Sequence, residues 1–183
     1  PMPQPSLASL SILLGLGYLI PQIYGLARPL EFGEKLRKFP RSNGWGYCLV
    51  GLATLWFLRT VQQEDIADFA AYKRIMLFGF AALGIATCIY VRDFLAVRGY
   101  AVLLLLAAKL MVDTARWVDT EWRLVIVLWA YLWVLGGMWF TISPWRVRDI
   151  ILWKTANPQR IRLICGIRGL FGLLVIGLGI FVF

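Results

Sequence analysis

The stretch from Ser143 to Gly166 reads SPWRVRDIILWKTANPQRIRLICG and separates two long apolar runs. Serine followed by proline is typical of a helix start, because serine can cap free N–H groups and proline at the first helical position loses no hydrogen bond. The next residues mix large apolar side chains with Arg146, Arg148 and Lys154, and Asn157-Pro158 stops the segment. We therefore expect a short helix that lies in the headgroup plane of a membrane, apolar face down and basic side chains up.

A similar connector runs from Pro29 to Gly51, and in both connectors the proline and the glycine are 22 residues apart. The same offset pairs residues 16–56 with residues 131–171. This match is compatible with a parallel internal repeat, and equally with convergence of two hairpins that share one architecture. Basic side chains accompany both connectors, and they are the predicted contacts for lipid headgroups: Lys35, Arg37, Lys38, Arg41, Arg146, Arg148, Lys154, Arg160 and Arg162.

The composition predicts an integral membrane protein. Of the 183 residues, 60% are hydrophobic, and the mean hydropathy is +0.72. A soluble domain of this size does not need so much apolar surface. The formal net charge of +9 comes from basic residues that cluster beside apolar runs, which favours anionic lipids as partners over nucleic acid.

Six apolar runs suggest an all-α membrane domain of about six spans that covers residues 1–183. A helix needs about 20 apolar residues to cross a ~30 Å hydrocarbon core. The second run is short, so we expect its helix to continue to Gln62, and a five-span alternative makes the third and fourth runs re-entrant. The expected bundle has three hairpins, 7–62, 75–118 and 123–183, built from the runs 7–26, 45–58, 75–91, 94–112, 124–142 and 163–183.

Loop charges predict the orientation. The loops after the second and fourth runs balance Arg59, Lys73, Arg74, Arg116 and Arg123 against six acidic residues. The other three connectors are strongly basic, so the positive-inside rule places them in the cytoplasm and both termini outside. Their basic residues are Arg28, Lys35, Arg37, Lys38, Arg41, Arg92, Arg98, Arg146, Arg148, Lys154, Arg160 and Arg162.

The sequence offers no catalytic set. Without histidine, the chain lacks the commonest metal ligand and general base and the usual axial ligand of haem. The three cysteines, Cys48, Cys88 and Cys165, form no CxxC pair and suit a packing role. We therefore expect no enzyme activity, no cofactor and no metal.

Polar residues within the apolar runs are the remaining candidates for a functional site. Lys109 and Asp113 share one helix face at a spacing of four residues, with Arg116 beyond them. Ionisable groups inside a span indicate function by default, although a pair this close to the surface can also snorkel outward. Gln22, beside Pro21, lines a polar pocket or, as we favour, makes an interhelical hydrogen bond.

The last apolar run carries a stripe of small residues that predicts close helix packing. Cys165, Gly169, Gly172 and Gly179 fall on one face of this helix, together with Ile176. Small residues let another helix approach closely in a membrane. Arg168 lies near the cytoplasmic face, where we expect it to snorkel.

The segments 143–146, 157–162 and 166–172 resemble the YjeT-like family of small two-helix bacterial inner-membrane proteins. The resemblance covers about the last third of the chain. It implies a bacterial inner membrane and no catalytic residues.

Together these observations predict a non-catalytic accessory or scaffolding subunit. It docks laterally on other integral membrane subunits and contacts anionic lipid at its cytoplasmic rim. The alternatives are a small transporter or channel that uses Gln22, Lys109 and Asp113, and a lipid-modifying membrane enzyme.

Overall fold

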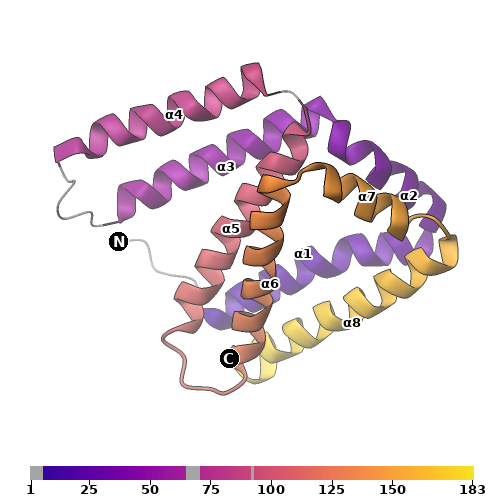
Figure 1. Cartoon of the computed structure of the whole chain (residues 1–183). Coiled ribbons are helices and arrows are strands. Elements are labelled where there is room, and N and C mark those ends of the chain that lie inside the picture. Colours follow the sequence, from indigo (N-terminus) through magenta and orange to yellow (C-terminus); the bar gives the residue numbers. More distant parts are fainter. Residues whose placement is uncertain (1–5, 65–70, 92) are drawn as a thin grey trace.

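The computed structural model describes residues 6–64, 71–91 and 93–183. These residues form helices and, within the described ranges, no strands. Figure 1 shows their arrangement. The elements are α1 (Leu7–Ala27), α2 (Pro29–Lys38), the 3-10 helix η1 (Phe39–Arg41), α3 (Asn43–Gln63), α4 (Lys73–Tyr90), α5 (Leu95–Ala115), α6 (Arg123–Ile142), α7 (Trp145–Lys154) and α8 (Pro158–Phe181).

Five helices are long and apolar enough to cross a membrane: α1, α4, α5, α6 and α8. Helix α3 also has 21 residues, but it opens with Asn43 and Gly44 and closes with Arg59, Gln62 and Gln63, which make it more polar. The helix that falls short is therefore α3, whereas α4 and α5 are two separate long helices. A sixth span through α3 remains a prediction.

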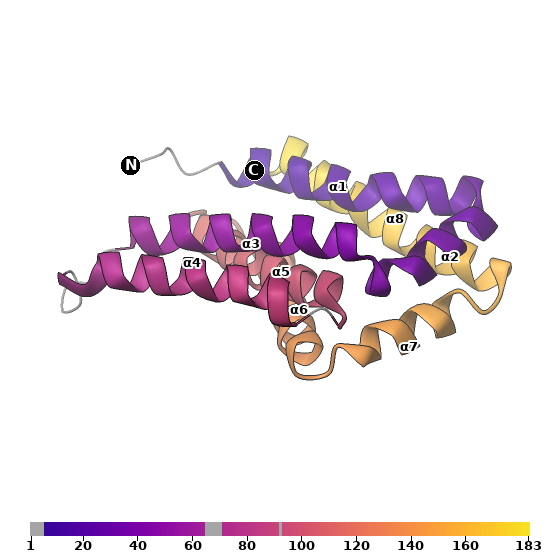
Figure 2. The same cartoon turned by 90° about the horizontal axis from the view of Figure 1, so that it is seen from above.

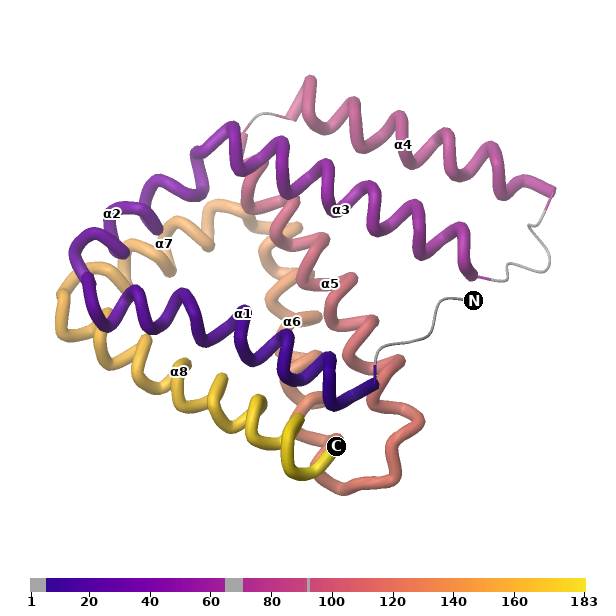
Figure 3. The backbone as a smooth tube through the Cα atoms, turned by 180° about the vertical axis from the view of Figure 1, so that it is seen from behind, coloured from indigo at the N-terminus to yellow at the C-terminus, as the bar shows by residue number. Residues whose placement is uncertain are grey.

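The long helices make four main contacts. The antiparallel pairs α1 with α8 and α5 with α6 and the parallel pair α3 with α5 pack extensively, whereas the antiparallel contact of α3 with α4 is smaller. Figures 1 and 3 show α4 at the edge of the molecule, next to α3. The strongest packing thus joins α1 to α8, two helices that the predicted hairpins 7–62 and 123–183 place in different units.

Small residues explain why α1 packs on α8. Cys165, Gly169, Gly172 and Gly179 are all buried on one face of α8. A Cβ atom at Gly15 of α1 would lie 2.5 Å from Ile176 Cγ1 and 3.0 Å from the Gly172 carbonyl oxygen. The two backbones therefore approach as closely as only glycine permits.

Glycine also sets the contact between α3 and α5. A Cβ atom at Gly99 would come within 2.7 Å of the Val50 nitrogen. Helix α4 is held differently, because none of its residues is buried. The rings of Phe57 and Phe80 meet edge to face with their centroids 4.9 Å apart and link α4 to α3.

Two apolar clusters lie at opposite ends of the long helices. The larger one joins α1, α5, α6 and α8, and at its centre the Tyr18 ring lies 5.2 Å from the Trp129 ring. The smaller one joins Val97 of α5 to Val147 and Ile151 of α7, with Leu36, Phe94 and Phe140 around them. The chain enters α5 through Phe94, whose left-handed conformation (φ 54°) turns it sharply after α4.

The two predicted connector helices are present, with corrections at their ends. Helices α2 and α7 have ten residues each. Ser143 does not cap α7, which begins after Pro144 without a side-chain cap; a backbone bond from the Arg146 nitrogen to the Ser143 carbonyl forms the turn instead. Asn157 and Pro158 do not merely stop α7. The Asn157 side chain caps α8, and Pro158 is its first residue.

The apolar face of α7 packs on protein rather than pointing freely into a membrane. Val147 and Ile151 are buried against α5 and α2, whereas Trp145 and Trp153 are exposed. Only part of the predicted membrane-facing surface of this connector is therefore available to lipid.

Candidate functional site

Alternating helix directions bring the basic connectors together at one end. Helix α2 contacts α7 and α8, and the start of α5 joins the same cluster; Figure 2 shows α2 and α7 side by side there. We call this region the basic end. Among the described residues, twelve basic and four acidic residues belong to it, whereas the opposite end holds six basic and four acidic residues. Most of the positive charge of the described residues is therefore located at the basic end.

Four of the nine predicted headgroup contacts are bound to the protein itself. Arg37 donates from Nε to Thr155 Oγ1 (2.8 Å) and from Nη2 to the Thr155 carbonyl (2.5 Å), which ties α2 to α7. Lys35 donates to Tyr24 Oη (2.9 Å). Arg148 pairs with Asp149 (2.9 Å), and Arg160 donates to the Trp153 carbonyl (3.0 Å) and covers the Trp153 ring.

The Tyr24 hydroxyl also organises an acid at the basic end. It donates to Glu31 (3.0 Å), which Arg28 approaches as well (3.3 Å). These two contacts, with the Tyr24 hydrogen bond the larger, lower the pKa of the Glu31 carboxyl. The same hydroxyl accepts a hydrogen bond from the Lys35 ammonium group, which raises the pKa of Lys35. Both side chains thus stay charged at neutral pH.

The other five predicted contacts are free to meet a headgroup. In the described ranges no hydrogen bond or ion pair engages their side chains, and all except Lys154 are exposed. They are Lys38, Arg41, Arg146, Lys154 and Arg162. Lys154 is half-buried, and its pKa is lowered first by burial and then by the charge of Arg168.

Arg168 lies within α8. We expected it to snorkel toward the membrane surface, but its side chain is bonded to α1 instead. Its Nε donates a 2.7 Å hydrogen bond to Tyr18 Oη of α1, and its guanidinium carbon lies 4.6 Å from the centre of the Tyr18 ring. It forms no ion pair with the described residues. The Nε of Arg98, at the start of α5, is buried and has no hydrogen-bond acceptor among the described groups.

The structure does not bring the residues of the predicted polar site together. Gln22 is buried on α1, and its amide donates to the Tyr18 carbonyl of its own helix (3.2 Å) rather than to a neighbour. Lys109 pairs with Asp113 (2.6 Å) and with Glu64 of the α3 end (2.8 Å). The side chains of this trio are between 41% and 54% exposed, so they form a surface ion cluster.

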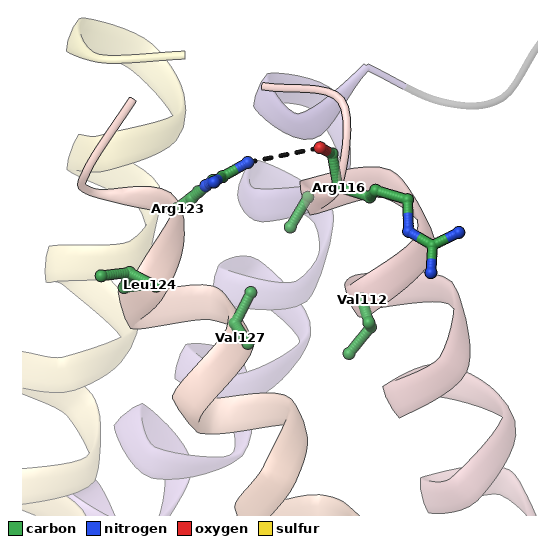
Figure 4. Close-up of a pocket in the computed structure, with 6 residues that line it drawn as sticks. Val112, Arg116, Arg123, Leu124 and Val127 are labelled. Atoms are coloured by element: carbon green, nitrogen blue, oxygen red, sulfur yellow. Dashed lines mark hydrogen bonds between the residues drawn. The ribbon is translucent and has the colours of Figure 1, made fainter. Parts of the chain in front are cut away.

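Arg116 borders a shallow hollow between α5 and α6 at the end opposite the basic end. The hollow has a volume of about 350 Å³ and is walled mainly by apolar residues of both helices. Figure 4 shows the Arg116 side chain directed away from Leu124 and Val127, while Arg123 donates to the Arg116 carbonyl (3.3 Å). Arg123 also donates to the Val118 carbonyl (3.1 Å), so its role here is to brace the loop.

Three contacts escaped the sequence analysis. Thr155 and Glu64 carried no motif, and Tyr18 and Arg168 are 150 residues apart. Only the small-residue stripe of α8 hinted that another helix, and hence some side chain such as Tyr18, would lie beside Arg168.

Five candidate spans indicate a multi-pass membrane protein built from helices. Among the described residues, no group of three or more His, Cys, Asp or Glu side chains could hold a metal ion. The chain matches no family model, no curated protein and no solved structure. The resemblance to the YjeT-like family therefore stays an expectation.

Proposed function

We propose that the protein is a non-catalytic accessory or scaffolding subunit of a larger complex in a bacterial inner membrane, with anionic lipid at its basic end. The observation that carries this proposal is the separation of charge: among the described residues, five cations without a hydrogen bond or ion pair belong to one end of an apolar helical molecule. Anionic headgroups attract such cations by about 1 kcal/mol each near a membrane surface.

Exposed helix faces support the lateral docking part of the proposal. Helix α4 buries none of its residues, and α6 shows a long row of large side chains. Such faces can contact lipid tails or another subunit. The α6 row includes aromatic residues, which are enriched at protein interfaces; its members are Leu124, Leu128, Tyr131, Leu132, Leu135, Met138, Trp139 and Ile142.

Lipid retention tests the basic end. The triple change of Lys38, Arg41 and Arg146 to glutamine removes three exposed cations that have no bonded partner in the described ranges. We expect native mass spectra of the purified variant to show less bound phosphatidylglycerol, with phosphatidylcholine unchanged. Retention equal to the wild type would leave these charges with a topological role only. Arg74→Gln, an exposed cation of the opposite end, is the matched control.

Mass measurement after extraction in a mild detergent tests the subunit proposal. A stoichiometric larger partner supports it, and a homo-oligomer favours the transporter alternative. That alternative requires Gln22, Lys109 and Asp113 to share a pathway, but no recorded bond joins Gln22 to the surface ion cluster of the other two. A lipid-modifying enzyme remains the third hypothesis.

A further inference from the structure

Among the described residues Arg168 has no counter-ion, although it lies within α8, a helix long and apolar enough to cross a membrane. It lies ten residues after Pro158, or about 15 Å along α8. Its Nε is satisfied by Tyr18, whereas its two terminal nitrogens have neither a hydrogen-bond partner in the described ranges nor full burial. An ionised guanidinium at this depth is costly unless it meets an anion.

The surroundings of Arg168 supply cations and aromatic rings rather than acids. Lys154 of α7 is half-buried without a bonded partner among the described residues, and its pKa is lowered first by burial and then by the charge of Arg168. Tyr18 is packed edge to face on Trp129 (5.2 Å) and Phe171 (6.2 Å), which holds its hydroxyl in place. Tyr18 thus fixes Arg168, and among the described residues no carboxylate pairs with Arg168 or with Lys154.

We propose that Arg168, Lys154 and Tyr18 form a specific site for the phosphodiester of an anionic phospholipid, between α1, α7 and α8. The planar guanidinium, held through Nε, presents its terminal N–H groups to two phosphate oxygens. Lys154 adds the second charge from the connector side. This inference rests on the proposed lipid binding and narrows it to one tightly held molecule.

In the proposed site, Arg168 provides both a positive charge and a planar fork of N–H donors. Two substitutions at this position separate the contribution of the charge from that of the fork. The full-length protein is freed of lipid in detergent and titrated with phosphatidylglycerol under native mass spectrometry. We expect Arg168→Gln to weaken the first bound lipid about tenfold or more, because a charge-assisted pair of hydrogen bonds is lost. Arg168→Lys keeps the charge but not the fork, and we expect an intermediate loss. Lys154→Gln should weaken the affinity for the first bound lipid about fivefold.

The control and the contrary results are equally specific. Arg74→Gln makes the same charge change at the opposite end and should leave the first lipid unaffected. Wild-type affinity in Arg168→Gln overturns the site; should that variant fail to fold, wild-type affinity in both Arg168→Lys and Lys154→Gln overturns it. If millimolar inorganic phosphate competes with the lipid, the site binds a free anion, and the proposal of a phospholipid ligand is overturned.

The rim variant of Lys38, Arg41 and Arg146 distinguishes this site from the broader proposal. If the rim variant loses lipid and Arg168→Gln does not, the rim binds lipid and the specific site is wrong. If Arg168→Gln alone loses its lipid, the site is supported and the rim proposal fails.

Discussion

Lys109 and Arg168 are both cations within long apolar helices, but their neighbours differ. Two carboxylates, Asp113 and Glu64, neutralise Lys109 at the surface. In the described ranges Arg168 bonds to the phenol of Tyr18 and to no carboxylate. A cation whose charge is matched within the chain has a structural explanation, whereas an unmatched cation in a span indicates a ligand.

Removal of the Lys109 charge should therefore be mild. Exposed pairs of this kind contribute about 0.3–0.5 kcal/mol each, so Lys109→Met should lower the unfolding free energy by less than about 1 kcal/mol. Thermal unfolding in detergent measures the change, with Lys109→Met/Asp113→Leu as the reference. If the single variant fails to assemble while the double variant assembles, the lysine neutralises a buried acid, and the transporter alternative gains support.

Helix packing depends on a few glycine positions at the scale of elements. In the contact between α3 and α5, a methyl group at Gly99 would meet the Val50 nitrogen at 2.7 Å and the Leu49 carbonyl carbon at 2.8 Å. Because backbone atoms cannot rotate away, the two helices would have to separate. We expect Gly99→Ala to destabilise the protein by about 1–3 kcal/mol.

The same pair of helices supplies the control for that substitution. A methyl group at Gly51 of α3 would meet nothing within 4 Å. Gly51→Ala should be neutral or slightly stabilising, because alanine favours a helix over glycine by about 1 kcal/mol. Equal melting temperatures for the two variants would contradict the close contact between α3 and α5.

Among the described residues, one side chain of α2 supplies the hydrogen bonds that join it to the end of α7. Arg37 makes two hydrogen bonds to Thr155, whose own hydroxyl donates to the Ile151 carbonyl (2.8 Å). Charge-assisted hydrogen bonds contribute about 1.5–3 kcal/mol. Arg37→Gln should speed hydrogen exchange in both α2 and α7, and Lys38→Gln, its unbonded neighbour, should not. Unchanged exchange in α7 would show that apolar packing alone holds the connectors together.

The sequence was sufficient for the helices but not for their partners. Long apolar runs and the two basic connectors predicted helices that the structure contains, whereas Pro158, predicted to stop one helix, begins the next. Pairing was harder, because the stripe at Gly169 and Gly172 indicates a close neighbour without naming it. Sequence order suggested the next helix along the chain, whereas matching small residues at Gly15 and Gly25 make α1 the partner.

Some contacts of the candidate site could be predicted from the sequence, and others could not. Local pairs such as Lys109 with Asp113 could be predicted from spacing within one helix. Arg168 with Tyr18 and Arg37 with Thr155 join residues more than a hundred positions apart, which no spacing rule connects. Which of the basic side chains are free and which are bound to the protein is likewise decided only by the fold.

In the part of the molecule that the structure describes, one end is strongly basic and the opposite end carries much less net charge. Antiparallel packing of α1 with α8, α3 with α4 and α5 with α6 places every basic connector on the same side. A membrane protein with this charge distribution is expected to retain its basic end in the cytoplasm, against the anionic leaflet. The proposed contact between the basic end and anionic lipid depends on this orientation.

Cysteine labelling in intact cells measures that orientation directly. In a background without Cys48, Cys88 and Cys165, single cysteines are placed at Lys38 and Arg146 of the basic end and at Asp119 of the opposite end. A membrane-impermeant maleimide added from outside should label position 119 and leave positions 38 and 146 unreacted until the cells are permeabilised. Labelling of 38 and 146 from outside, with 119 protected, would contradict a cytoplasmic basic end and the lipid site derived from it.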